Sequence, residues 1–403
     1  MKKSMIVAAM LAMVATGANA KSATDSATIA KNKPVFTVVK QNPITSIKDQ
    51  NRSGTCWAYS TLSYFESEIL KHTGKTYDLS EMFVANKTYM DRATMAVRMH
   101  GDVSFSQGGS AYDVLYALQH YGIVPEGAMP APGTLTGDSL ANFGEFFDVM
   151  TPYVEAVAKS KAKKISSAWK SGLQGIIDSY IGKTPEKFTY QGKQYTPQSF
   201  CQSLGLNLDD YVTITSYTHH PMWSKFAVEV QDNWRWPLSY NVPMDDLCKI
   251  IDNAINNGYT IAWGGDVTED GFTRKGLGIA YDVKKVRSMA GTDADHWFKL
   301  SKDEKKEKFD SLGVNAPEVV PTQAMRQEAF DNWETTDDHG MHIYGIAKDQ
   351  NGKEYYMVKN SWGEYGDYKG TWYMTKAFVA YKTMDFMVNK NAIPKDIRKK
   401  LGI

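Results

Sequence analysis

Apolar residues recur at helical spacing in the N-terminal part of the chain. From Trp57 to Leu70 they return every three or four positions, which predicts an amphipathic helix of roughly four turns that ends near Gly74. Ser80 is a good N-cap residue and predicts the start of a second helix. A third helix is expected over residues 111–121, after a glycine-rich turn. This part of the chain is therefore expected to be mainly helical.

Short apolar runs of the β type dominate the C-terminal part. A hairpin is predicted over residues 188–195, with Gln191-Gly192 at its turn, and an amphipathic helix over residues 245–256. Strands are predicted at residues 35–39, 211–217, 260–263, 341–346, 355–359 and 372–374. The pattern predicts the α+β class, with a helical part followed by a β-rich part.

The first 20 residues have the pattern of a secretory signal. Lys2 and Lys3 precede an apolar run over residues 5–15, which is too short to span a bilayer, and Ala18-Asn19-Ala20 offers small residues for cleavage. We expect a signal peptide over residues 1–20, cleaved after Ala20, and a flexible leader over residues 21–34. The alternative is a membrane-anchoring helix. The mature chain is expected to be exported, either periplasmic or secreted, without a further membrane span.

Composition argues against several classes of partner. The 403 residues include 46 basic and 45 acidic side chains, a net charge of +1, which does not favour nucleic-acid or membrane-surface binding. The three cysteines are an odd number, so at least one thiol is free, and the pairing of Cys201 with Cys248 stays open. The sequence contains no Cys-x-x-Cys spacing, so its cysteines do not indicate a metal site, and no cofactor is expected. The adjacent histidines His219 and His220 are interpreted as part of a surface loop.

Cys56 stands where the polar segment 49–55 turns into the first predicted helix. The unpaired amides and the positive dipole end of a helix N-terminus favour a thiolate, which is the nucleophilic form of cysteine. Gln50 lies six residues upstream, and its side-chain amide is placed to donate a hydrogen bond to an oxyanion beside the sulfur. Cys56 is therefore a candidate nucleophile and Gln50 a candidate oxyanion donor.

A cysteine nucleophile needs a base, and the base needs an orienting partner. The candidates are His339 and Asn360, both beside predicted strands of the C-terminal part, with Trp362 placed to shield their hydrogen bond from water. His342 competes for the role of base. An offset of three places His342 on the opposite face of a strand from His339, so we expect it to be a packing residue.

The Gly108-Gly109 pair is a candidate substrate-binding segment. An extended substrate needs exposed backbone with which to pair, and a side chain there would obstruct it. The alternative is an ordinary turn.

These segments resemble those of papain-like cysteine peptidases: Gln50, then five residues, then Cys56-Trp57-Ala58, and later Asn360-Ser361-Trp362-Gly363. Cys56 and His339 lie 339 − 56 = 283 positions apart, against roughly 130–150 in compact members of the superfamily. The intervening motifs resemble the bleomycin hydrolase and aminopeptidase C branch. They include Gln119-His120-Tyr121-Gly122, Tyr195-Thr196-Pro197, Asn241-Val242-Pro243 and Ala262-Trp263-Gly264-Gly265.

The resemblance implies a papain-like fold, with a cleft between its helical and β-rich parts and a large helical insertion. We assign the peptidase domain to residues 35–403 and the insertion to about 131–325. By the same resemblance Cys56 is the nucleophile, His339 the base, Asn360 the orienter and Gln50 the oxyanion donor. It further implies an aminopeptidase that acts on short peptides and assembles as a homo-oligomer, in the family often a hexamer.

The chain departs from this family at its two ends. The signal peptide is unusual, and the sequence stops at Ile403, where family members usually continue into an arm that offers its carboxylate to the substrate amine. The final stretch, residues 395–403, is expected to be the end of a basic helix. Two alternatives to the aminopeptidase therefore stay open: an endopeptidase with an open cleft, and a non-catalytic peptide-binding protein on the same fold.

Overall fold

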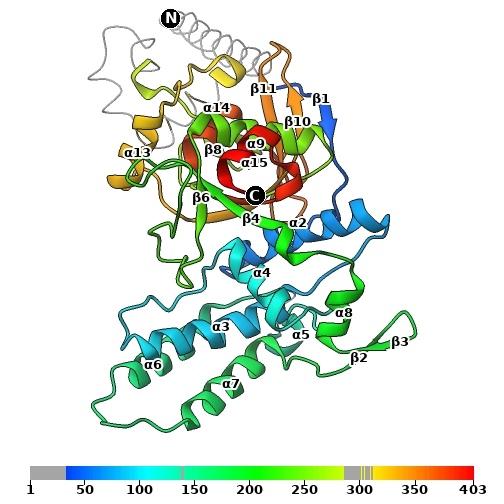
Figure 1. Ribbon diagram of the computed structural model, residues 1–403, viewed down its shortest axis with the longest axis vertical. Coiled ribbons are helices and arrows are strands. Elements are labelled where there is room, and N and C mark those ends of the chain that lie inside the picture. The colour runs from blue at the N-terminus through cyan, green and yellow to red at the C-terminus, as the bar shows by residue number, and fades with distance from the viewer. Residues whose placement is uncertain (1–32, 138–139, 286–300, 302–303, 305–308, 310–311) are drawn as a thin grey trace, which may run out of the picture.

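Two hydrophobic cores organise the protein, one among helices and one around a large sheet. The computed structural model describes residues 33–137, 140–285, 301, 304, 309 and 312–403. The predicted signal peptide and nearly all of the predicted leader lie outside these residues. The first core extends from Trp57 to Tyr211 with two contributions from the sheet, and the second extends from Ile214 to Leu401. In Figure 1 the helical part lies below the sheet.

Helix α2 (Cys56–Thr73) forms the boundary between the two parts. It ends at Gly74, whose φ of 69° is the left-handed conformation that glycine adopts without strain. Helix α3 (Glu81–Arg98) begins at Ser80, whose side chain accepts a hydrogen bond from the Phe83 amide. The remaining helices of this part are α4 (Ala111–His120), α5 (Gly133–Thr136), α6 (Gly144–Ala158), α7 (Ala168–Ile181) and α8 (Pro197–Ser203).

The main sheet has the strand order β5-β6-β4-β13-β7-β10-β11-β12-β9-β8, with β1 also paired to β10. Its strands are β1 (Thr37–Gln41), β4 (Tyr211–Thr215), β5 (Lys225–Phe226), β6 (Ser239–Asn241), β7 (Ile261–Gly265), β8 (Phe272–Thr273), β9 (Leu277–Gly278), β10 (His339–Lys348), β11 (Glu354–Lys359), β12 (Thr371–Thr375) and β13 (Thr383–Asn389). A separate hairpin consists of β2 (Phe188–Tyr190) and β3 (Lys193–Tyr195). Helices α9 (Met244–Asn256), α13 (Gln323–Asp331), α14 (Lys376–Lys382) and α15 (Lys395–Leu401) accompany the sheet. Short 3₁₀ turns cover Glu126–Ala128, Leu208–Asp210, Gly313–Asn315 and Lys390–Ala392.

The start of β10 lies directly against the start of α2. A side-chain Cβ at Gly340 would come within 2.7 Å of the Ser60 Oγ and 3.3 Å of the Cys56 carbonyl oxygen. Glycine is therefore required for this close approach, because any larger residue would separate strand and helix. The contact brings the N-terminus of α2 beside His339, the first residue of β10.

Most predicted elements are present within one to three residues of their expected ends. The elements that the sequence did not predict include α13, α14, the short strands β5, β6, β8 and β9, and the central strand β13, which pairs with β4 on one side and β7 on the other. The prediction of a helix at the C-terminal end is confirmed by α15. All three cysteines are free, so Cys201 and Cys248 do not pair. Among the described residues, no helix is both long and apolar enough to cross a membrane.

Candidate active site

Cys56 is the first residue of α2 and faces a cavity between the helical part and the sheet. The cavity has a volume of about 260 Å³, and its lining includes Cys56, Gly108, Gly109 and His339. The predicted nucleophile, base and glycine pair therefore meet in one cleft. Their segments are far apart in the sequence and are brought together by the packing of α2 on β10.

His339 is held by Asn360, as the sequence predicts. The imidazole Nε2 lies 2.8 Å from the Asn360 Oδ1, which also accepts a hydrogen bond from the Ser361 amide at 2.8 Å. Because this oxygen can only accept, Nε2 carries the hydrogen and Nδ1 is left as the basic nitrogen. The Trp362 ring lies 5.0 Å from the imidazole ring, centroid to centroid, and covers it on one side.

His342 faces away from the cavity, as predicted for an offset of three along β10. Its ring is fully buried, and its Nδ1 lies 2.9 Å from the Ser63 Oγ on α2. It therefore ties β10 to the middle of α2. Only His339 of the two lines the cavity with Cys56, and its role as the base stays a prediction.

Burial shifts the pKa values of Cys56 and His339 in the directions that favour their neutral forms. It raises the pKa of the Cys56 thiol to about 12, with a further increase from Asp337 and Asp232, while backbone hydrogen bonds from Gly340 and Trp57 oppose the rise. Burial likewise lowers the pKa of His339 to about 4, against the opposing hydrogen bond with Asn360. Burial thus acts against the contribution of the helix N-terminus, and the expected thiolate stays a prediction.

Gln50 is buried beside the site but does not line the cavity. Its Nε2 donates to the Ser53 carbonyl at 2.7 Å, and its Oε1 accepts from the Ser361 Oγ at 2.6 Å. These bonds link the segment before Cys56 to the segment after Asn360. One hydrogen of the Gln50 Nε2 is therefore already donated to Ser53, and only the other could be donated to an oxyanion. The role of Gln50 as oxyanion donor stays a prediction.

The two glycines are needed for reasons that the sequence did not reveal. A Cβ at Gly108 would lie 1.8 Å from an Asp232 carboxylate oxygen, and one at Gly109 would lie 2.8 Å from the Trp57 ring. Asp232 itself forms an ion pair with the fully buried Arg92, at 3.1 Å. The glycine pair therefore lets an acidic side chain reach the cleft beside the nucleophile.

Four carboxylates line the cavity, and no lysine or arginine appears among the described residues of its wall. They are Asp232, Asp337, Asp338 and Asp385. Burial raises the pKa of three of them. It raises the pKa of Asp337 well above its usual value, the pKa of Asp338 to about 7 and the pKa of Asp385 to about 6. Sequence reasoning missed this group. Only Asp337-Asp338, adjacent to His339, gave any signal, since the others come from distant segments.

Comparison with known proteins identifies the family. The chain matches the Peptidase C1-like family over residues 2–402. It belongs to that family. Among curated relatives, Aminopeptidase G of Lactobacillus delbrueckii subsp. lactis is 23% identical over 89% of this chain and 84% of its own length. Bleomycin hydrolase of Homo sapiens is 21% identical over 92% of this chain and 86% of its own. Family membership confirms the predicted cysteine-type peptidase.

A solved structure supports the same fold. The crystal structure of PepW from Lactobacillus rhamnosis HN001 (DR20) has a TM-score of 0.65 and 18% sequence identity, and the match covers 98% of this chain and 92% of that one. Together with the family match, it confirms the predicted papain-like α+β fold. The boundaries of the insertion, residues 131–325, stay a prediction.

Proposed function

We propose that this protein is an aminopeptidase, which uses Cys56 to remove N-terminal residues from short peptides. The observation that carries the proposal is the acidic wall of the catalytic cleft. A peptide's free α-ammonium group is a cation near neutral pH, and a cavity wall that holds carboxylates but, among its described residues, no lysine or arginine favours binding such a group. That relatives are named aminopeptidases and bleomycin hydrolases gives further support.

The chemistry begins with the Cys56–His339 pair. His339 Nδ1 takes the proton of Cys56, and the sulfur attacks the scissile carbonyl carbon. The amides at the start of α2, with Gln50, are placed to stabilise the oxyanion. The imidazolium then returns its proton to the leaving amine, and water, activated by His339, hydrolyses the thioester.

Among the four carboxylates, Asp337 is the best candidate for contact with the ammonium group. It precedes His339 by two residues, lines the cavity together with Cys56, and receives no hydrogen bond or ion pair from the described residues. Asp232, by contrast, is already paired with Arg92. Asp337 is thus the carboxylate with the greatest unused capacity for a cation.

The chain's final residues do not provide this contact in the structure. Ile403 packs beside the second hydrophobic core, and its amide donates to the Arg398 carbonyl at 3.1 Å. It is absent from the described wall of the cavity. In this proposal the selector for a free N-terminus is therefore the cleft wall rather than a C-terminal carboxylate.

The proposal is tested with matched fluorogenic peptides that differ only in N-acetylation. The aminopeptidase should cleave the free peptide and leave the acetylated one intact, because acetylation removes the cationic charge. Asp337→Asn should lower kcat/KM for the free peptide by about 10–100-fold, the equivalent of a charged hydrogen bond of about 1.5–3 kcal/mol. Asp245→Asn, at an exposed position of α9, is the control. Efficient cleavage of the acetylated peptide would instead establish the endopeptidase alternative.

Export and assembly belong to the same proposal. We infer a periplasmic or secreted enzyme from the signal-like residues 1–20, and a homo-oligomer from the family resemblance. N-terminal sequencing of the mature protein should begin at Lys21. Light scattering should give a mass several times that of the 45.1 kDa chain. A start at Met1, or a monomeric mass, would contradict the respective inference.

A further inference from the structure

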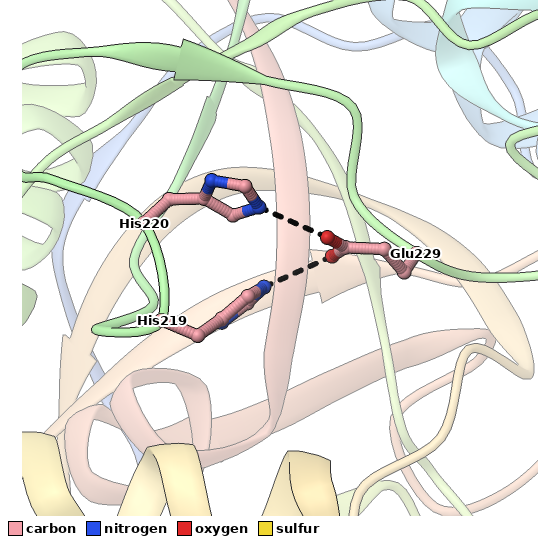
Figure 2. A group of neighbouring side chains, drawn as sticks. All are labelled: His219, His220 and Glu229. Atoms are coloured by element: carbon pink, nitrogen blue, oxygen red, sulfur yellow. Dashed lines mark hydrogen bonds and ion pairs between the residues drawn. The ribbon is translucent and has the colours of Figure 1, made fainter.

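His219, His220 and Glu229 converge on one point outside the catalytic cleft (Figure 2). The His219 Nε2 lies 3.0 Å from one Glu229 carboxylate oxygen, and the His220 Nε2 lies 3.0 Å from the other. The three potential ligand atoms lie within 4.8 Å of one another. Sequence reasoning placed the histidine pair on a loop surface but missed Glu229, which approaches from a neighbouring segment.

Contacts behind the rings fix their orientation. The His219 Nδ1 lies 3.3 Å from the Gln327 Oε1 on α13, which can accept a hydrogen bond from an Nδ1–H, and the Gln327 Nε2 donates to Asp331 at 2.8 Å. The His220 ring stacks on Phe226, with centroids 4.2 Å apart. Partners of this kind hold metal-ligating imidazoles in place in known metal sites. Both Nε2 atoms therefore point toward Glu229 without further rearrangement.

We propose that His219, His220 and Glu229 bind a divalent transition-metal ion, with Zn²⁺ as the reference case. Zinc lies about 2.0–2.2 Å from imidazole nitrogen and carboxylate oxygen, so tetrahedral ligands are roughly 3.3 Å apart. The present N–O separations of 3.0 Å need to widen by only a few tenths of an ångström. The ion takes the place of the hydrogen that now joins each imidazole Nε2 to the carboxylate, and in each neutral ring that hydrogen moves to Nδ1.

The accessibility of the site suits an exchangeable ion. The side chains of His219, His220 and Glu229 are 30%, 36% and 53% exposed. An ion can enter from solvent and keep water at its fourth position. Two histidines and one carboxylate are a ligand set that zinc accepts in other proteins.

The site also lies beside the wall of the catalytic cleft. Val228 and Val230, on either side of Glu229, both line the cavity, as does Asp232. A bound ion joins this segment to the His219-His220 loop and, through Gln327, to α13. The metal is therefore expected to stabilise one wall of the cleft. This inference does not depend on whether the enzyme is an aminopeptidase or an endopeptidase.

The test uses the Cys56→Ala protein without a histidine tag, because the active-site thiol and a tag would both bind zinc. Isothermal titration with ZnCl₂ at about pH 7.5 should give one Zn²⁺ per chain, and the melting temperature should rise with zinc concentration. Glu229→Gln and His220→Ala should each weaken binding at least about 10–100-fold, the loss seen for outer-shell partners alone. His120→Ala, an exposed histidine on α4, should bind as the parent does.

The Glu229→Gln variant should fold normally, because glutamine has the same shape as glutamate and the side chain at this position is largely exposed. Weaker zinc binding in this variant therefore cannot be attributed to a folding defect. The inference is overturned by the absence of stoichiometric zinc binding. It is equally overturned by affinity that is the same in the Glu229→Gln, His220→Ala and parent proteins, which would place the ion elsewhere.

Discussion

The two histidines of β10 offer the sharpest comparison within the chain, because they lie three residues apart on one strand and face opposite sides. His339 faces the cleft and bonds to Asn360, whereas His342 is buried against Ser63. Replacing each by alanine removes the same side chain from the same strand. We predict that His339→Ala loses activity with little loss of stability and that His342→Ala does the reverse.

The magnitudes follow from what each ring does. General-base catalysis contributes about 10²–10⁴-fold, so His339→Ala should raise the activation barrier by about 3–5 kcal/mol. For His342→Ala, a buried cavity costs about 2–5 kcal/mol and the lost Ser63 bond about 1 kcal/mol. Its Nε2 has no partner among the described residues, and removing that buried atom returns about 1–3 kcal/mol. The net loss of stability is about 2 kcal/mol.

Two assays separate the variants. The kcat/KM of a free fluorogenic peptide measures catalysis, and urea denaturation followed by tryptophan fluorescence measures stability. The predicted His342→Ala enzyme keeps kcat/KM within about threefold of the parent at a temperature where it is folded, a change of well under 1 kcal/mol in barrier. If His342→Ala were inactive while folded and His339→Ala active, the assignment of the base would be refuted.

Further predictions concern the cleft and its support. The KM for a free peptide should fall as pH rises from about 5 to 7.5, because burial raises the pKa of Asp385 to about 6 and that of Asp338 to about 7, and only the ionised carboxylates attract the ammonium group. A flat KM over this range would contradict it. Gly108→Ala should raise KM, because the added Cβ would lie 1.8 Å from an Asp232 carboxylate oxygen and would push that carboxylate away. A crystal structure of the variant should show the shifted Asp232 side chain. Arg326→Met should lower the free energy of unfolding by about 3 kcal/mol or more, measured by urea denaturation. The reason is that the fully buried Arg326 guanidinium donates hydrogen bonds to the carbonyls of Ser216, Ala380 and Tyr381. Unchanged stability would show that water satisfies these carbonyls in the variant.

Local motifs in the sequence were sufficient to choose the candidate catalytic residues. Cys56 was recognisable from the change of polar segment to helix, and Asn360 from the string that ends in Trp362 and Gly363. Their meeting in one cleft followed from family resemblance, since nothing in the local pattern gives the packing of α2 on β10. That packing depends on Gly340, which the sequence presents as an ordinary glycine.

Features created by tertiary packing were not predictable in this way. The amides at the start of α2, which favour a thiolate, are visible in the sequence, whereas the burial by distant segments that raises the pKa of Cys56 is not. Strand β13 was missed because Asp385 and the flanking polar residues interrupt its apolar run, although it is central in the sheet. Asp232 and Glu229 became functional candidates only when the structure placed them beside Gly108 and the histidine pair.

The central claim is that Cys56 alone among three free thiols performs peptide hydrolysis. Cys201 is buried in the helical core, and Cys248 lies on α9 beside the sheet core. The direct measurement is turnover of a free fluorogenic peptide, with covalent labelling by a thiol-directed epoxide followed by mass spectrometry, in three single alanine variants. We predict that Cys56→Ala abolishes turnover and labelling while remaining folded, and that Cys201→Ala and Cys248→Ala retain both. Turnover that persists in a pure Cys56→Ala preparation would contradict the account.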